Sequence, residues 1–228
     1  MRAYGAVLAV AVALLLVGLA GVQRAPAWVY EEQAQVSTMA GELVAGATVG
    51  QTFVARYGGL QRVEMRLAGC EPHQSGPLIF HLRPSPHAAD DLVTLHLDMA
   101  DVHGDGYFAF GFPPLRGSAG QRLYFYLEAP QSTAGHAIGV WGVTQDTYAD
   151  GEAVLEGLGQ SGVRDLAFRL SYDPSPSERI GVALDRLAAN KPLAWGDRRL
   201  YVVLAAAHLA LLCALLIRLL TSEERDLR

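Results

Sequence analysis

Tyr124 and Tyr126 are well placed for ligand binding, because they alternate with apolar residues in a stretch predicted to be a strand. Successive side chains of a strand point to opposite faces, so the two tyrosines share one face. Leu123, Phe125 and Leu127 share the other face. Exposed tyrosine rings can stack on a sugar, which makes the pair a candidate glycan site. The more ordinary alternative is that the rings pack under a loop or on a neighbouring strand.

Three carboxylates lie close together in the sequence DMADVHGDG, namely Asp98, Asp101 and Asp105. Oxygen ligands of this kind suit Ca²⁺, so a structural calcium site is a candidate, and no other cofactor is indicated. The spacing fits no EF-hand loop. A solvated acidic turn without a metal is the alternative interpretation.

Two histidines, His81 and His96, lie on the polar faces of two strands that are predicted to be neighbours. If these strands form a hairpin, the histidines and Asp98 could face one another. A metal site would need that register and a further ligand or water. Ordinary surface histidines are the simpler explanation.

The sequence contains no recognisable arrangement of a nucleophile with a base. Ser118 has Arg116 instead of a glycine two residues before it, so a nucleophile elbow is absent. Residues 157–162 match GxGxxG, but a predicted strand follows where a dinucleotide site needs a helix. We therefore expect a protein that is not an enzyme.

The middle of the chain has the two-residue hydrophobic period of strands that are buried on one face. Val63, Met65 and Leu67, for example, alternate with charged residues. Clusters of Gly, Pro, Asp and Ser separate several stretches of this kind, which predicts an all-β fold, an antiparallel β-sandwich of jelly-roll type. The predicted strands are 51–56, 61–67, 78–83, 93–99, 107–112, 121–129, 137–144 and 166–172, with 42–45 and 152–156 as further candidates.

Apolar runs long enough to cross a membrane lie at both ends of the chain. The first 18 residues of the run 200–220 carry no formal charge, as a helix through ~30 Å of hydrocarbon requires. Residues 3–22 form the other run, which is either an uncleaved span or a signal peptide ending near Ala25-Pro26-Ala27. His208 lies near the middle of 200–220, where an ionisable side chain usually faces protein. We therefore expect His208 at a helix interface.

These features divide the chain into six segments. Residues 1–27 form an N-terminal transmembrane helix or signal anchor, 28–40 a linker, and 41–173 the β-sandwich. Residues 174–199 form a juxtamembrane helix and linker, with Ser177 as the expected cap of a helix from Glu178. Residues 200–220 form a transmembrane helix and 221–228 a cytoplasmic tail. The lipid bilayer is thus a partner, and the export-like N-terminus places the sandwich on the extracytoplasmic side.

The segment between the two apolar ends is acidic. Residues 28–195 hold 11 Lys and Arg against 19 Asp and Glu, a net charge of −8, whereas the whole chain has −5. This charge disfavours a nucleic-acid partner, whose phosphates need cationic side chains. Of the two cysteines, Cys213 lies inside the predicted span and Cys70 far outside it, so no disulfide framework is expected.

A series of residues at predicted strand edges carries a resemblance to a known group of folds. They are Gln51-Thr52-Phe53, Gly76-Pro77-Leu78, Phe110, Pro113, 118–121 before 123–127, Trp141-Gly142, 148–151 and 165–169. Over Gly41–Tyr172 the chain resembles the galactose-binding-like, carbohydrate-binding-module-like jelly rolls of bacterial exported and membrane-anchored proteins. The resemblance implies a binding or scaffolding role in a bacterial cell membrane, with a glycan as a candidate partner. It carries over no ligand site.

Three functions follow as hypotheses. The first is a membrane-anchored, non-enzymatic extracytoplasmic β-sandwich that binds a glycan or envelope polymer. The second is a structural accessory subunit of a membrane complex, with partner proteins held through Ala-rich transmembrane helices. The third is a membrane-bound hydrolase, which would need a cleft with convergent titrating groups.

Overall fold

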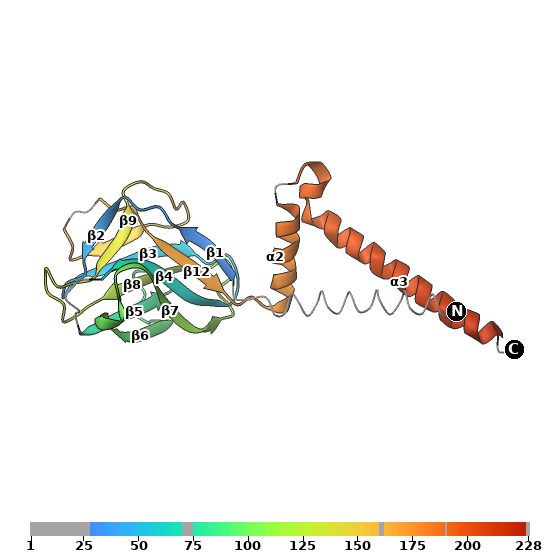
Figure 1. Ribbon diagram of the computed structural model, residues 1–228, viewed down its shortest axis with the longest axis horizontal. Coiled ribbons are helices and arrows are strands. Elements are labelled where there is room, and N and C mark those ends of the chain that lie inside the picture. Colours follow the sequence, from blue (N-terminus) through green and yellow to red (C-terminus); the bar gives the residue numbers. More distant parts are fainter. Residues whose placement is uncertain (1–27, 70–74, 160–161, 190, 227–228) are drawn as a thin grey trace. The chain divides into compact units, whose positions relative to one another are not determined.

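The computed structural model describes residues 28–69, 75–159, 162–189 and 191–226. Residues 28–175 form a compact β-rich unit, and residues 176–226 belong to a second, helical unit (Figure 1). The predicted N-terminal transmembrane helix, 1–27, lies outside the described residues.

The β-rich unit consists of two antiparallel sheets. Strands pair only in antiparallel fashion throughout its described part, which confirms the predicted antiparallel β-sandwich. The seven-stranded sheet contains β1 (Trp28–Gln33), β2 (Thr38–Glu42), β4 (Leu60–Ala68), β7 (Asp105–Leu115), β9 (Gly139–Val143), β11 (Asp165–Leu166) and β12 (Phe168–Tyr172). The five-stranded sheet has the order β10 (Ala153–Glu156), β3 (Thr48–Val54), β8 (Arg122–Glu128), β5 (Pro77–Arg83) and β6 (Val93–Asp98).

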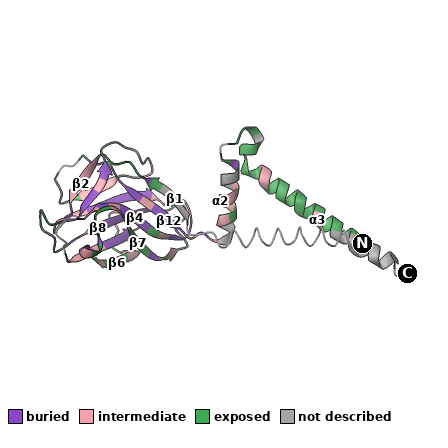
Figure 2. Cartoon of the chain, in the orientation of Figure 1, coloured by how far each residue is buried: buried purple, intermediate pink, exposed green. Residues whose placement is uncertain are grey.

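The hydrophobic core lies between the two sheets, on the inner face of each alternating strand (Figure 2). The β4 residues Val63, Met65 and Leu67 are all 0 % exposed, as their alternation predicts. Aromatic rings join the sheets: the ring centroid of Phe125 in β8 lies 5.5 Å from that of Phe168 in β12. Burial of apolar area of this kind is the main stabilising contribution to such a fold.

The prediction of a linker over 28–40 is wrong, because this segment supplies β1 and most of β2. β1 pairs with β12, and β2 pairs with β9. β1 is an edge strand that carries Glu31, Glu32 and Gln33. Edge strands are often polar, which protects them from pairing with other chains, so they lack the alternating pattern that identified the inner strands.

A buried polar contact connects the sheets at one end of the sandwich. Gln51 of β3 and Asp165 of β11 are 0 % and 1 % exposed. The Gln51 side-chain amide donates to Asp165 Oδ1 at 3.3 Å, and its oxygen accepts from the Leu166 backbone at 2.8 Å. Asp165 Oδ2 accepts from the backbone N–H groups of Thr147 and Tyr148 at 2.7 and 3.0 Å. Asp165 thus holds the loop after β9 against both sheets.

The helical unit contains α2 (Pro176–Ala188), a short 3₁₀ turn, η2 (Leu193–Gly196), and α3 (Arg198–Asp226). α2 begins at Pro176, two residues before the expected start, because the fixed φ of proline suits the first position of a helix. In the described part, α3 is the one helix long and apolar enough to cross a membrane; its stretch Arg198–Leu215 has a mean hydropathy of 1.6 and is 0 % buried. α3 continues to Asp226, so most of the predicted tail, 221–228, is helical.

Replacing Asp165 with alanine should lower the free energy of unfolding by about 3 kcal/mol, because it leaves several buried donors without an acceptor. Urea unfolding of the full chain in detergent, followed by tryptophan fluorescence, measures the change. Asp146→Ala removes a carboxylate that is 63 % exposed and 3.8 Å from Arg164, and should cost no more than about 0.5 kcal/mol. Equal losses for both variants would contradict the role given to Asp165.

Candidate functional site

The candidate site lies on the outer face of the five-stranded sheet. Tyr124, Tyr126 and Glu128 point to this face, because the residues between them on β8 point into the core. β5 lies beside β8 and places His81 opposite Tyr126 and Arg83 opposite Tyr124. The register of the two strands therefore gathers aromatic, cationic and acidic side chains on one face.

Three rings on this face stack in a row, Tyr124 and Tyr126 of β8 and His81 of the neighbouring β5. The ring centroids of His81 and Tyr126 lie 4.4 Å apart, with an interplanar angle of 5°. Those of Tyr126 and Tyr124 lie 5.4 Å apart, at 16°. Stacking covers the ring faces, so Tyr124 and Tyr126 are only 4 % and 7 % exposed. Both rings therefore pack on neighbouring side chains, which is the ordinary alternative, and they do not form an exposed platform. Their part in ligand binding stays a prediction.

Gly50 of β3 makes room for the Tyr124 ring. A Cβ atom at Gly50 would lie 2.6 Å from Tyr124 Cε2 and 2.4 Å from the carbonyl oxygen of Phe125. Aromatic side chains commonly cover glycines on a neighbouring strand in this way. The resulting burial raises the pKa of the Tyr124 hydroxyl, so it stays a neutral hydrogen-bonding group.

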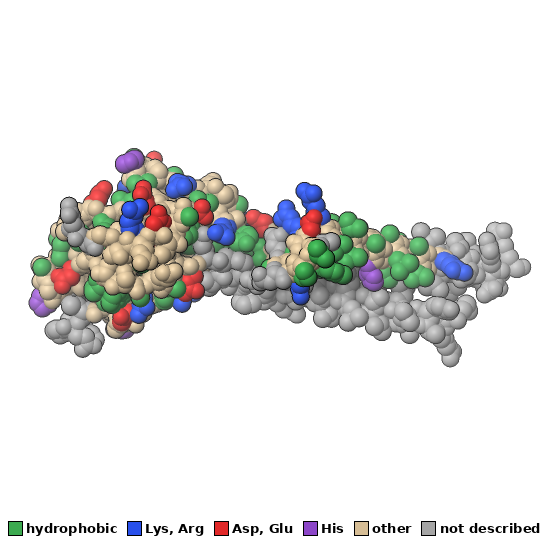
Figure 3. Space-filling view, turned by 90° about the horizontal axis from the view of Figure 1, so that it is seen from above, with side chains coloured by type: hydrophobic (Ala, Val, Ile, Leu, Met, Phe, Trp, Pro, Cys, Tyr) green, Lys and Arg blue, Asp and Glu red, His purple; other side chains and the backbone are tan. Residues whose placement is uncertain are grey.

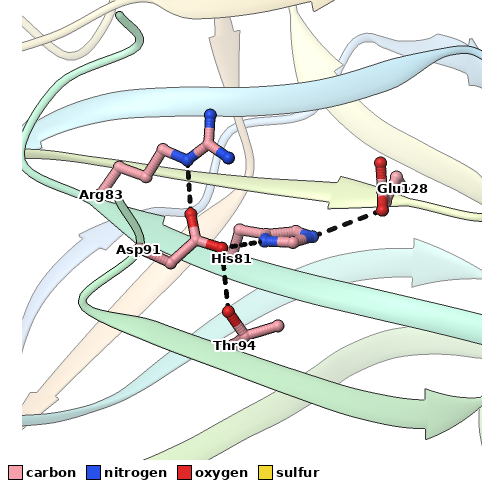
Figure 4. A network of polar contacts seen from close by, with 5 residues as sticks. All are labelled: His81, Arg83, Asp91, Thr94 and Glu128. Atoms are coloured by element: carbon pink, nitrogen blue, oxygen red, sulfur yellow. Dashed lines mark hydrogen bonds and ion pairs between the residues drawn. The ribbon is translucent and has the colours of Figure 1, made fainter. Parts of the chain in front are cut away.

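Asp91, in the loop between β5 and β6, is the centre of a polar network beside the rings (Figure 4). Its Oδ2 lies 2.6 Å from His81 Nδ1 and accepts from the Thr94 hydroxyl at 2.9 Å. Its Oδ1 accepts from Arg83 Nε. Burial opposes ionisation of Asp91, but hydrogen bonds from Arg83, His81 and Thr94 outweigh it and lower the pKa of the carboxyl to about 2. Asp91 is therefore an anion at neutral pH and holds the hairpin loop in place.

The second ring nitrogen of His81 faces a further carboxylate. Nε2 is buried and lies at ion-pair distance, 3.5 Å, from Glu128 Oε1 (Figure 4), and it has no hydrogen-bond partner among the residues that the structure describes. Glu128 has a side chain that is 37 % exposed, so it can turn toward solvent or toward a ligand. The Arg83 guanidinium lies 4.8 Å from the Tyr126 ring centroid and completes a row of donors and acceptors. Such a row suits a ligand whose own groups both donate and accept hydrogen bonds.

The predicted calcium site at Asp98, Asp101 and Asp105 is not formed. Asp98 caps the 3₁₀ turn η1 (Met99–Asp101) and accepts from two backbone N–H groups at 2.9 and 3.0 Å, which lower the pKa of its carboxyl. Asp105 accepts from Arg66 Nε at 3.1 Å, and Asp101 is exposed. Backbone and arginine donors thus satisfy two of these carboxylates. Across 28–69, 75–159, 162–189 and 191–226, no three His, Cys, Asp or Glu side chains are grouped as metal ligands.

The remaining histidines have different environments. β5 and β6 form the hairpin that the alternation suggested, and His96 lies opposite Ile79. His96 is exposed and does not join the network of His81. His208 is exposed on α3. Its expected place at a helix interface stays a prediction.

Sequence reasoning identified His81 but missed Asp91, Arg83, Thr94 and Glu128 as its neighbours. Arg83 and Glu128 lie two residues from His81 and Tyr126 on predicted strands, so the two-residue period could have found them. Asp91 lies in a loop, where no period applies. Its position follows from the hairpin register, which sequence alone does not fix.

No protein-family model matches this chain, and no curated protein sequence matches it either. The jelly-roll resemblance therefore depends on the strand-edge residues alone. Fold and side-chain geometry remain the basis for a functional proposal.

Asp91→Asn should lower the free energy of unfolding at pH 7 by about 1 to 2 kcal/mol, after allowance for solvent screening. The folded-state pKa of about 2 lies below the usual aspartate value of 3.8, so the ionised carboxylate stabilises the fold above pH ~4 and this contribution is lost as the pH falls toward ~2. Unfolding free energies of wild type and variant should therefore converge between pH 4 and 2. Asp101→Asn serves as the exposed control, and the prediction fails if it behaves like Asp91→Asn.

Proposed function

We propose that this chain is a non-enzymatic, membrane-tethered module on the extracytoplasmic side of a bacterial membrane. Its β-sandwich binds a hydroxyl-rich polymer of the envelope, such as a glycan. The binding surface is the outer face of the five-stranded sheet, where His81, Arg83, Tyr126 and Glu128 gather. The jelly-roll resemblance supports the same assignment as an analogy of fold.

The pair formed by His81 Nε2 and Glu128 carries this proposal. Within the described part of the chain the ring nitrogen has no hydrogen-bond partner, and it lies 3.5 Å from a carboxylate that is part-exposed. A buried polar atom without a partner is costly, so a ligand group that satisfies it is favoured. A sugar hydroxyl can pair with the imidazole and donate to the carboxylate at once. Recognition then takes place at ring edges through hydrogen bonds, since the ring faces are covered.

The apolar surface of α3 supports the tether. Its 18-residue stretch Arg198–Leu215 has a mean hydropathy of 1.6 and is 0 % buried, and hydrophobic side chains line the face of α3 that Figure 3 shows. A helix that is apolar all round is stable in lipid, where its backbone groups bond internally. Together with the predicted N-terminal span, α3 would hold the sandwich outside the bilayer.

Glu128→Gln should weaken binding of envelope polysaccharide about tenfold, because an amide replaces the charged acceptor of a ligand hydroxyl. Calorimetric titration of the full chain in nanodiscs, with polysaccharide fractions from bacterial envelopes, measures the affinity. The matched control is Glu64→Gln on β4 of the other sheet, which should bind as the wild type does. Absence of binding by the wild type to every fraction would eliminate the glycan proposal.

An accessory role in a larger membrane complex is the second candidate, and His208 favours it. Its ionisable side chain is exposed on the apolar stretch of α3. Such a side chain in hydrocarbon is costly unless it faces protein. A partner helix that contacts His208 would remove this cost.

His208→Leu should release a partner that copurifies with the wild-type chain in mild detergent, because the leucine removes the polar contact within the span. Size-exclusion chromatography and mass spectrometry of the native complex measure the loss. Cys213→Ala, elsewhere on α3, is the control that should retain the partner. A wild-type chain that purifies as a lone monomer would count against the accessory role.

A further inference from the structure

The turn between α2 and α3 presents two large apolar side chains to the outside. Leu193 is 95 % exposed and Trp195 is 55 % exposed. Large apolar side chains usually leave water on folding, so two of them close together on one turn indicate a contact surface. Trp in particular is enriched at the boundary between lipid headgroups and acyl chains.

Several contacts hold this turn in an unusual conformation. Leu193 has a φ of +55°, in the left-handed region that branched side chains rarely adopt. A Cβ at Gly196 would come within 2.8 Å of the Lys191 carbonyl oxygen, so the turn closes tightly on itself. The Tyr201 hydroxyl donates to the Trp195 carbonyl at 3.0 Å, which ties the turn to α3. Strain that is maintained by surrounding contacts points to a function for the residue concerned.

Cationic side chains surround the same turn. Lys191, Arg198 and Arg199 are exposed, and against them stands one carboxylate, Asp197, so three cations minus one anion leave a charge of +2 over 191–199. Asp197 Oδ1 already accepts from the Arg199 backbone at 2.8 Å. An open recess of about 630 Å³, lined by Lys191, Leu193 and Arg198 among others, lies between the end of α2 and the start of α3. The recess therefore combines an apolar side with a positively charged one.

We propose that this turn binds the headgroup of an anionic phospholipid. The proposal rests on the membrane tether proposed above. Arg198 is both a lining residue of the recess and the first residue of the apolar stretch Arg198–Leu215, so the recess is continuous with the surface that would face lipid. Lys191 and Arg198 bind the lipid phosphate, while Leu193 and Trp195 enter the boundary of the acyl chains. Cations next to a membrane attract anionic lipids in this manner.

Lipid retention by the full chain tests the headgroup site. The chain is reconstituted in nanodiscs of phosphatidylcholine with phosphatidylglycerol, extracted with mild detergent and examined by native mass spectrometry. The triple variant K191Q/R198Q/R199Q should retain phosphatidylglycerol about tenfold less than the wild type. The matched control R62Q/R122Q/R164Q removes the same charge from exposed positions on the sandwich and should retain it as the wild type does. Equal retention by both triple variants would overturn the proposal.

The depth of Trp195 gives an independent readout. Fluorescence quenching by brominated phosphatidylglycerol, taken as the difference between the wild type and Trp195→Phe, isolates this side chain. Quenching that is stronger than in brominated phosphatidylcholine supports the site, and no Trp195-dependent quenching overturns it. A chain that stays in the nanodisc without selective retention leaves the tether intact and eliminates the lipid site. A chain that does not enter the nanodisc eliminates both.

Discussion

The two-residue period of β8 determines both the core and the candidate site. Phe125 points inward and contacts Phe168 of the opposite sheet, so β8 cannot shift by one residue without exposing that ring. With Phe125 fixed inside, Tyr126 must face outward, and the pairing of β8 with β5 then sets it opposite His81. Core packing on one face thus determines which side chains meet on the other. The site could not be rebuilt by surface substitutions alone, because its register is decided inside the sandwich.

The inner strands could be predicted from sequence because a buried face imposes a regular period. Val63, Met65 and Leu67 alternate without exception, and they are fully buried. The edge strand β1 has no such constraint: Glu31 and Glu32 remain compatible with a strand that has one free edge, so nothing in their pattern distinguished it from a linker. A two-residue alternation of apolar and polar residues therefore identifies a strand only where one face of that strand is buried against the opposite sheet.

The candidate site was less predictable because its geometry depends on register and on close packing. Alternation placed Tyr124 and Tyr126 on one face of the strand. It could not show how closely the neighbouring rings would pack. Gly50 allows the Tyr124 ring to lie across β3, and the effect of a glycine in β3 on a ring in β8, five strands later in the chain, is not visible in a sequence pattern. The Asp98 cluster depends on contacts of the same kind: the backbone N–H groups of Ala100 in the turn and of Gly76 before β5 already donate to that carboxylate.

The short connection between the sandwich and the helical unit has a consequence for affinity. Asp173, Pro174 and Ser175 alone separate β12 from α2, and Asp173 is bound to the sandwich by Arg116 at 3.0 Å. Under the proposed tether, with α3 in a bilayer, residues 173–197 would be the whole connection between β12 and the span, so the sandwich could not diffuse far from the membrane. Confinement by a short tether gives an effective concentration in the millimolar range. A binding site on the sandwich that is too weak to be filled in dilute solution would be filled there. Several copies of the chain bound along one polymer would add avidity. Selection could then act on local occupancy instead of on intrinsic strength of binding.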